Sequence, residues 1–176
     1  MGMVDSPQGV LVFFFGPAGA GKSTLAREWC RIWEWAAQIG LDDVRSMIVS
    51  GLADPQSGSP VVAEQYETAA QACCALARTF LSAGYDVTVD DAETPHGFKE
   101  HWEPHLTGLR WKMVVIRPDL QTTLRRNDGR TKNVRTDIIR RQHADAAQWP
   151  VELTVDTTGL TVAESLRRVE QILASQ

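Results

Sequence analysis

The chain has 176 residues, of which 43% are hydrophobic and 23% charged, and its formal net charge is −4. This length and this balance are typical of one globular domain that buries a single core, so we expect residues 1–176 to form one domain. The net negative charge argues against a protein whose whole surface binds nucleic acid, because such proteins carry a broad basic field. A local basic patch stays possible.

The cysteines and the apolar runs bear on the compartment. Cys30, Cys73 and Cys74 are odd in number and lack C-x-x-C spacing, so neither a disulfide framework nor a zinc site is expected. The apolar run Val10–Phe15 is too short to span a bilayer. We therefore expect a cytoplasmic protein that has no membrane partner.

The first predicted element is a buried strand over Val10–Phe15, which leads into the glycine-rich segment Gly16–Ser23. This segment has the G-x-x-x-x-G-K-S pattern of a phosphate loop, in which glycines let backbone N–H groups converge on phosphate oxygens at a helix N-terminus. Lys22 is expected to reach the β- and γ-phosphates, and the Ser23 hydroxyl to ligate Mg²⁺. The alternative is a chance glycine-rich turn. The predicted nucleotide-binding residues are Gly16, Ala18, Gly19, Ala20, Gly21, Lys22, Ser23 and Thr24.

The rest of the chain alternates predicted helices and strands. Helices are predicted over 23–35, 61–83, 95–106, 119–126, 134–147 and 162–174. Strands are predicted over 36–41, 85–89, 111–116 and 151–155. Trp29, Trp33 and Trp35 lie in or next to the first helix, where we expect them to pack in the core. The alternation predicts an α/β fold: a five-stranded parallel sheet with helices on both faces, as in phosphate-loop NTPases.

Asp42 and Arg45 follow the predicted strand 36–41, at the edge where open α/β sheets bind ligands. Asp42 is a candidate general base for an acceptor hydroxyl. Arg45, three residues further on, could hold an anionic group of the acceptor. The spacing leaves an alternative equally open, in which Asp42 caps the next helix and Arg45 is solvated.

Asp90 follows the predicted strand 85–89, which we expect beside the phosphate loop. A carboxylate there can hold Mg²⁺ through water or orient Lys22 and an arginine. Asp91 is a competing candidate for this role. The alternative for Asp90 is a helix N-cap.

Basic residues gather between positions 125 and 141. They are Arg125, Arg126, Arg130, Lys132, Arg135, Arg140 and Arg141. Such a segment, late in a chain with a phosphate loop, predicts a lid over about 125–135 that closes over the nucleotide and supplies an arginine to the transition state. The alternative is a solvated charged helix.

Together these residues resemble the kinase domain of bacteriophage polynucleotide kinase and its phosphate-loop relatives, which include small phosphotransferases of the chloramphenicol phosphotransferase type. The likeness runs from about Phe14 to Ala144. It rests on Gly-Lys-Ser-Thr at 21–24, Asp-Asp-Val-Arg at 42–45, the strand that ends at Asp90, and the basic segment from Arg126. It implies a fold similar to nucleoside and shikimate kinases, with ATP and Mg²⁺ as cofactors.

The resemblance also implies a role for each matching residue. Asp42 matches the general base, and Arg45 matches a residue that contacts a phosphate of the acceptor. Asp90 matches the supporting carboxylate. We expect it to contact the acceptor and, together with Ser23, to hold the metal. Arg130 and Arg126 match lid arginines that touch the transferring phosphate and the nucleotide.

These observations predict an ATP-dependent kinase that transfers the γ-phosphate to a hydroxyl, with Asp42, Lys22, Arg130 and Arg126 as catalytic residues. A small-molecule acceptor such as a nucleoside, sugar or antibiotic is favoured. One alternative is a polynucleotide 5′-hydroxyl kinase, which Arg45 favours but the net charge and Val44 disfavour, because the phage enzyme has an aromatic residue at that position. A second alternative is a nucleotide-binding or hydrolysing module without an acceptor. The sequence does not indicate an oligomeric state.

Overall fold

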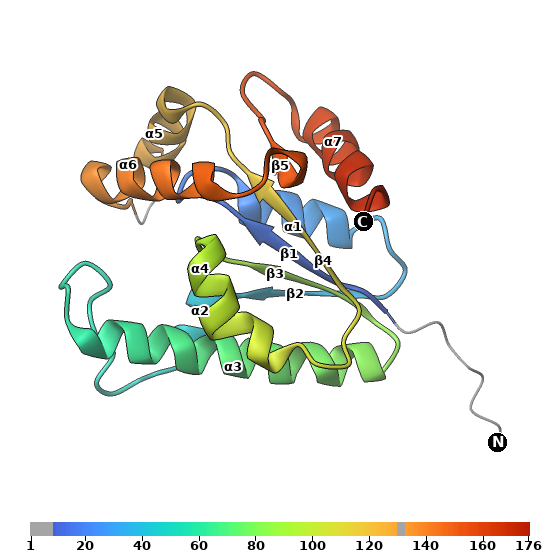
Figure 1. Ribbon diagram of the computed structural model, residues 1–176, viewed down its shortest axis with the longest axis horizontal. Coiled ribbons are helices and arrows are strands. Elements are labelled where there is room, and N and C mark those ends of the chain that lie inside the picture. The colour runs from blue at the N-terminus through green and yellow to red at the C-terminus, as the bar shows by residue number, and fades with distance from the viewer. Residues whose placement is uncertain (1–8, 130–132) are drawn as a thin grey trace.

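Five parallel strands form one sheet in the order β2-β3-β1-β4-β5 in the computed structural model, which describes residues 9–129 and 133–176 (Figure 1). The strands are β1 (Leu11–Phe15), β2 (Ala36–Gly40), β3 (Asp86–Asp90), β4 (Trp111–Ile116) and β5 (Thr154–Val155). The longer helices are α1 (Lys22–Cys30), α3 (Pro60–Ser82), α5 (Leu120–Asp128), α6 (Thr136–Asp145) and α7 (Val162–Ala174). The short helices are α2 (Leu41–Arg45) and α4 (Pro95–Gly97), and α4 continues as a π-helical turn (Phe98–Trp102) and a 3-10 turn (Glu103–His105). The predicted α/β fold is therefore confirmed.

β1 is buried on both faces, and its alternate side chains enter two different cores. Val12 and Phe14 pack with residues of α1 and α7 on one face of the sheet. Leu11, Phe13 and Phe15 pack on the other face, with α3 and the segment that follows α4. A strand in the middle of a parallel sheet is expected to be apolar at every position, as this run is.

Aromatic rings fill the second core and fasten the chain near the carboxyl ends of the strands. The Phe13 ring centroid lies 5.2 Å from that of Trp102, at 76°. Phe15 stacks on Trp149 with centroids 5.2 Å apart and an angle of 9°. These contacts hold the α4 segment and the region after α6 against β1, so both are fixed relative to the phosphate loop.

The register of the strands brings three chain segments to one edge of the sheet. Asp90, the last residue of β3, pairs with Phe14 of β1 and with Gly40 of β2. The phosphate loop after β1, α2 after β2 and the acidic residues that end β3 therefore lie together. This is the edge at which open α/β sheets bind ligands.

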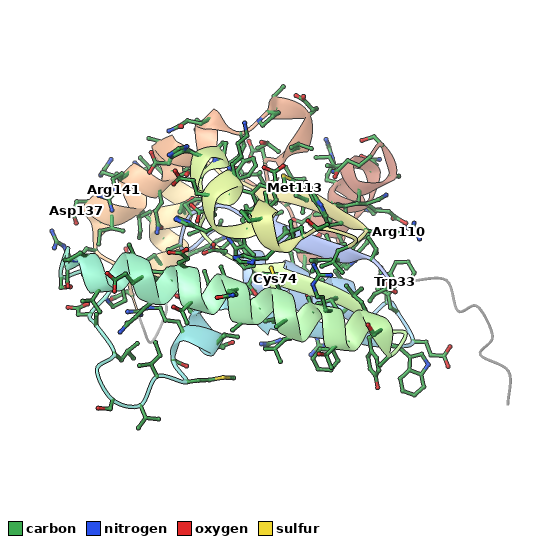
Figure 2. The ribbon with its side chains drawn as sticks, turned by 60° about the horizontal axis from the view of Figure 1, so that its bottom comes forward. Trp33, Cys74, Arg110, Met113, Asp137 and Arg141 are labelled. Atoms are coloured by element: carbon green, nitrogen blue, oxygen red, sulfur yellow. The ribbon has the colours of Figure 1, made fainter. Side chains whose placement is uncertain are left out.

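Two predictions for the region around the end of α1 were wrong. α1 ends at Cys30, and Trp33 and Trp35 are 44% and 57% exposed rather than core residues. The chain needs the residues between Cys30 and Ala36 to reverse direction and enter β2, so the helix cannot continue. Figure 2 shows Trp33 at the opposite end of the molecule from Asp137 of α6.

The last strand is shorter than the predicted 151–155. Val151–Leu153 forms a 3-10 turn after Pro150, and only Thr154 and Val155 pair with β4. A short strand suits its position at the edge of the sheet.

Candidate active site

The phosphate loop joins β1 to α1 and contains three glycines with positive φ. The φ angles of Gly16, Gly19 and Gly21 are 137°, 84° and 98°. A Cβ at Gly16 would lie 2.1 Å from the carbonyl oxygen of Ile116, and one at Gly19 would lie 2.5 Å from that of Thr123. The loop is pressed against the chain after β4 and against α5, so both the backbone angles and the available space require glycine.

The N-terminus of α1 faces the loop. Its N-cap is Gly21, and no side chain of the described residues caps it, so its first backbone N–H groups can bind an anion. Lys22 Nζ donates a hydrogen bond to the Pro17 carbonyl oxygen at 3.0 Å and so lies over the loop. This arrangement suits a phosphate chain, which needs several N–H donors and a nearby cation.

Asp90 and Ser23 are joined directly. Ser23 Oγ donates to Asp90 Oδ2 at 2.6 Å, and Gln38 Nε2 donates to Asp90 Oδ1 at 3.1 Å and to the Ser23 carbonyl oxygen at 3.0 Å. Asp90 does not cap a helix, because the N-cap of α4 is Thr94. A hydroxyl and a carboxylate in contact are oxygen ligands of the kind that Mg²⁺ prefers, so Ser23 and Asp90 fit this ion. No group of three or more His, Cys, Asp or Glu residues within 9–129 and 133–176 forms a separate metal site.

A cavity of about 340 Å³ lies between the phosphate loop, the start of α1, Arg126 of α5 and the chain that leads into α7. Its lining includes Gly19, Gly21, Thr24, Arg126, Thr157 and Leu160. Arg126 donates from Nη1 to the Ala20 carbonyl oxygen at 3.0 Å and from Nη2 to that of Thr157 at 3.3 Å. The predicted nucleotide-binding residues Thr24 and Arg126 therefore lie in one cavity beside the loop, where a nucleoside attached to the bound phosphates would fit.

Asp42 is exposed in the first turn of α2. Its side chain does not cap that helix, because the N-cap is Gly40 and has no side-chain hydrogen bond. Asp42 Oδ1 instead accepts a hydrogen bond from the Tyr66 hydroxyl of α3 at 3.2 Å. An exposed carboxylate at this edge can accept a proton from a bound hydroxyl.

Arg45 is only 5% exposed. It donates from Nη2 to the Ala53 carbonyl oxygen and to Gln65 Oε1, and its guanidinium carbon lies 4.7 Å from the centroid of the Tyr66 ring. The alternative in which the Arg45 side chain is solvated is therefore wrong. Its predicted contact with an acceptor stays a prediction, and it requires these contacts to change.

The pKa of Asp91 is affected both by Lys22 of the phosphate loop and by Asp42. Burial raises its pKa to about 7, Glu93 and Asp42 contribute to the rise, and the Ala92 N–H and Lys22 oppose it. A carboxyl with such a pKa near the loop is a candidate functional group. Because both Lys22 and Asp42 act on the titration of this one side chain, Asp91 connects the two halves of the site.

A family model described as AAA domain matches residues 11–153. The chain belongs to this AAA domain family. A comparison with curated proteins finds no match.

Solved structures share the fold of this AAA domain. A sugar kinase from a Janibacter species, in an unliganded structure, has a TM-score of 0.72 at 14% identity, over 96% of this chain and 95% of that chain. The Mycobacterium tuberculosis APS kinase CysC, in complex with AMPPNP and APS, has a TM-score of 0.64 at 17% identity, over 96% and 99% of the two chains. A chain of the Pnkp1/Rnl/Hen1 RNA repair complex has a TM-score of 0.63 at 19% identity over 79% of this chain. This AAA domain spans only 44% of that RNA repair chain. The resemblance to phosphate-loop kinases is thus confirmed for family and fold.

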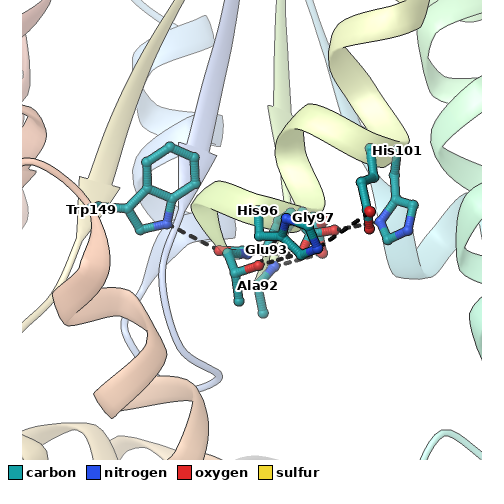
Figure 3. Close-up of polar contacts among 9 residues, drawn as sticks. Ala92, Glu93, His96, Gly97, His101 and Trp149 are labelled. Atoms are coloured by element: carbon teal, nitrogen blue, oxygen red, sulfur yellow. Dashed lines mark hydrogen bonds and ion pairs between the residues drawn. The ribbon is translucent and has the colours of Figure 1, made fainter.

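In this AAA domain the segment after Asp91 forms one wall of the site, and its polar contacts centre on Glu93 (Figure 3). Its carboxylate pairs with His101 Nδ1 at 3.1 Å, and its carbonyl oxygen accepts from Trp149 Nε1 at 3.1 Å. Gly97 leaves room for the carboxylate, because a Cβ there would lie 2.1 Å from Glu93 Oε1. The wall therefore places a second carboxyl group near Asp91.

The predicted lid is only partly described in this AAA domain. Arg130 and Lys132 lie outside the described residues, so the proposed contact of Arg130 with phosphate stays a prediction. At the base of this segment the buried Asn127 donates to the Val134 carbonyl oxygen at 3.0 Å and accepts from the Val134 N–H at 2.9 Å. Asn127 thus bonds to Val134 while lying next to Gly19 of the phosphate loop.

Tyr66, Gln38, Gln142 and Glu93 contribute to the site of this AAA domain and were missed in the sequence. Gln142 Oε1 accepts from the Ala18 N–H of the phosphate loop at 3.0 Å. Tyr66, Gln38 and Gln142 each bond to a residue far away in the chain, whereas the Glu93 side chain acts on the nearby Asp91 and His101. None of the four belongs to a motif. The only signal in the sequence was that 36–41 and 85–89 are both predicted strands of a parallel sheet, so Gln38 and Asp90 belong to the same sheet.

Among the helices within the described ranges, none combines the length and the apolar character that crossing a membrane requires.

Proposed function

We propose that this AAA domain is an ATP-dependent kinase that transfers the γ-phosphate to a hydroxyl of a small molecule. The observation that carries the proposal is the exposed Asp42 carboxylate at the same sheet edge as the phosphate loop, with Asp91 responding to both Asp42 and Lys22. A hydrolysing module needs no such carboxylate on the far side of the loop. A kinase needs one to accept the proton of the acceptor hydroxyl.

In the proposed reaction the phosphate loop and Lys22 hold the β- and γ-phosphates, and the cavity beside Arg126 takes the nucleoside. The acceptor hydroxyl lies between Asp42 and the γ-phosphate. Its proton moves to Asp42 as its oxygen bonds to the γ-phosphorus, and the bond from that phosphorus to the bridging oxygen breaks, so that ADP leaves. Arg126, and Arg130 when the lid closes, stabilise the negative charge on the moving group.

Ser23 and Asp90 would hold Mg²⁺ in this scheme. When bound, the ion supplies positive charge to the phosphate oxygens. Gln38 keeps the two ligands together, because it donates to both Asp90 Oδ1 and the Ser23 carbonyl oxygen. The side chain of Asp90 thus contributes on the metal side of the site and the side chain of Asp42 on the acceptor side.

The burial of Arg45 supports a neutral small molecule over a nucleic-acid end. A nucleotide acceptor carries a phosphate that needs a cation, and the cation predicted for it is 5% exposed and already bonded to Ala53 and Gln65. The formal net charge of −4 acts in the same direction. A polynucleotide 5′-hydroxyl kinase remains the second candidate, because the fold is shared with a chain of an RNA repair complex.

The test is phosphate transfer from γ-labelled ATP and Mg²⁺ to a panel of nucleosides, sugars and antibiotics, with a 5′-hydroxyl oligonucleotide in parallel. Asp42→Asn should lower transfer about 10²- to 10⁴-fold and leave ATP affinity unchanged, as expected for loss of a general base. Asp43→Asn is the matched control, because Asp43 is the adjacent exposed carboxylate on α2, and it should transfer at the parental rate. Parental transfer by Asp42→Asn would rule out the proposed base, and labelling of the oligonucleotide alone would favour the second candidate.

A further inference from the structure

Tyr66 contacts two predicted acceptor-side residues at once. Its hydroxyl donates to Asp42 Oδ1 at 3.2 Å, and its ring lies under the Arg45 guanidinium, 4.7 Å from centroid to Cζ. Asp42 and Arg45 stand three residues apart on α2, whereas Tyr66 comes from α3. The hydrogen bond uses one carboxylate oxygen of Asp42, and the described part of the chain offers Oδ2 no hydrogen bond. The free oxygen is the one that can accept a proton from an acceptor.

Arg45 is held firmly in this arrangement. Its Nη2 is bonded to the Ala53 carbonyl oxygen and to Gln65 Oε1, and Gln65 also accepts from the Ala53 N–H at 3.0 Å and donates to the Gly51 carbonyl oxygen at 2.8 Å. Gln65 and Tyr66 are neighbours on α3, so one turn of that helix fixes both the arginine and the aspartate. This network anchors α2 and the chain after it to α3.

The charged groups next to Tyr66 favour its role as a hydrogen-bond donor. A cation over an aromatic face withdraws electron density from the ring, which strengthens the phenol O–H as a donor. Burial raises the pKa of Tyr66 well above its ordinary value, and the Asp42 carboxylate adds to the rise while Arg45 opposes it. Asp91 also raises it slightly. The phenol therefore keeps its proton, which the hydrogen bond to Asp42 requires.

We propose that Tyr66 is a positioning residue, which holds Asp42 through Oδ1 so that Oδ2 faces the acceptor hydroxyl, and that Arg45 acts through the Tyr66 ring instead of contacting the acceptor. This inference rests on the proposed function. Tyr66 neither gains nor loses a proton in the reaction: the acceptor proton goes to Asp42, and the phosphoryl group goes from ATP to the acceptor oxygen.

The first experiment measures the conformation of Asp42 and needs no acceptor. Three-bond NMR couplings report whether the Asp42 side chain keeps one χ1 rotamer in the parental protein, in Tyr66→Phe and in Tyr85→Phe. The chain has two tyrosines, so Tyr85→Phe is a matched control at a distant site. We expect one dominant rotamer in the parental protein and in the control, and averaging among rotamers in Tyr66→Phe. An unchanged rotamer in Tyr66→Phe would overturn the proposal.

The second experiment measures kinetics with the acceptor that the panel identifies. Tyr66→Phe keeps the ring and should lower kcat about tenfold with an unchanged KM for ATP, because a hydrogen bond to a charged group is lost. Arg45→Met should lower kcat with an unchanged KM for the acceptor, and should add little to Tyr66→Phe, since coupled residues are not additive. Arg45→Lys should restore part of the loss by returning a cation to the ring.

The outcomes separate this inference from the proposed function. If Arg45→Met raises the acceptor KM and leaves kcat unchanged, Arg45 contacts the acceptor and the proposed role of Arg45 is wrong. If Asp42→Asn abolishes transfer while Tyr66→Phe transfers at the parental rate, the proposed function stands and the role of Tyr66 falls. If Asp42→Asn itself transfers at the parental rate, the proposed base fails first.

Discussion

The two sides of the candidate site are built in different ways. On the nucleotide side, one continuous segment after β1 provides backbone N–H groups. The positive φ angles require glycine at 16, 19 and 21, and close neighbours also require it at 16 and 19. On the acceptor side, side chains arrive from α2, α3 and the chain after β3, and they hold one another through contacts such as that of Tyr66 with Asp42. A site made of backbone groups can be predicted from a short motif. A site made of side chains from distant segments forms only when the chain folds. The motif can therefore indicate the type of reaction but not the acceptor.

The largest effect should come from breaking the nucleotide side at Gly19. Its Cβ would lie 2.5 Å from the Thr123 carbonyl oxygen at a φ of 84°, so Gly19→Ala must displace the loop or α5. We expect a loss of more than about 3 kcal/mol in the free energy of unfolding and at least a hundredfold weaker ATP binding. Urea denaturation and a fluorescent nucleotide titration measure the two quantities.

Gly84→Ala is the matched control for the loop variant. Gly84 has a φ of 88°, almost that of Gly19, but a Cβ there meets no atom within 4 Å. It should lose about 1–2 kcal/mol, which is the cost of the left-handed backbone alone, and should bind ATP normally. Equal losses in the two variants would mean that the contact with Thr123 is unimportant.

The acceptor side can be sharpened through Asp91, whose pKa the fold raises to about 7 from an ordinary value of 3.8. Between these values the folded protein binds the Asp91 proton more tightly than the unfolded chain does. This contribution to stability is complete below pH 3.8 and is lost as the pH rises through 7. In Asp91→Asn the side chain does not titrate, so the variant should gain on the parental protein by up to about 1.4 kcal/mol per pH unit within this window.

Denaturation of the nucleotide-free protein at several pH values measures this difference. Glu93→Gln removes one of the charges that raise the pKa of Asp91 and should lower the upper end of this pH window, while its lower end stays at the value of the unfolded chain. A difference between Asp91→Asn and the parental protein that stays constant from pH 4 to 8 would show that Asp91 titrates normally (about pH 4).

The sequence was sufficient for the fold because its signals are local. The apolar run into Gly16–Ser23, the alternation of helices and strands, and the glycine after α3 all appear within short windows. The errors arose where tertiary geometry decides: Trp33 and Trp35 continue a helical pattern, yet the chain must turn there to reach β2. Val151–Leu153 looks like a strand, yet β4 offers a partner only to Thr154 and Val155.

The candidate site was predictable only in part, for the same reason. Asp42 and Asp90 follow predicted strands, and the parallel register brings their segments to one edge, so their neighbourhood could be anticipated. Tyr66 could not be anticipated, because it lies within a long helix, and only the packing of α2 on α3 directs its hydroxyl to Asp42. Arg45 was predicted from its position and charge, and a sequence does not reveal that its Nη2 bonds to Ala53 and Gln65.

The smallest of the three effects concerns Asp90, which stands on the border between the two sides. Asp90→Asn keeps the shape of the side chain but removes the charge that accepts from Ser23 Oγ at 2.6 Å and from Gln38 Nε2 at 3.1 Å. If Asp90 helps to hold Mg²⁺, the gain in ATP affinity that Mg²⁺ gives should fall by about tenfold or more, in line with about 1.5–3 kcal/mol for a charged hydrogen bond. ATP affinity without Mg²⁺ should hardly change, because the phosphate loop binds through its backbone.

Asp86→Asn is the control on the same strand. Asp86 begins β3, at the other end from Asp90, where its carboxylate accepts from the Val10 N–H at 2.8 Å. It should lower stability without altering the effect of Mg²⁺ on ATP binding. If instead both variants respond to Mg²⁺ as the parental protein does, Asp90 is not a metal ligand. Its role is then to hold Ser23 and Gln38 in place. A loss confined to Asp90→Asn would mean that this side chain helps to hold the metal ion beside the phosphates that the loop backbone binds.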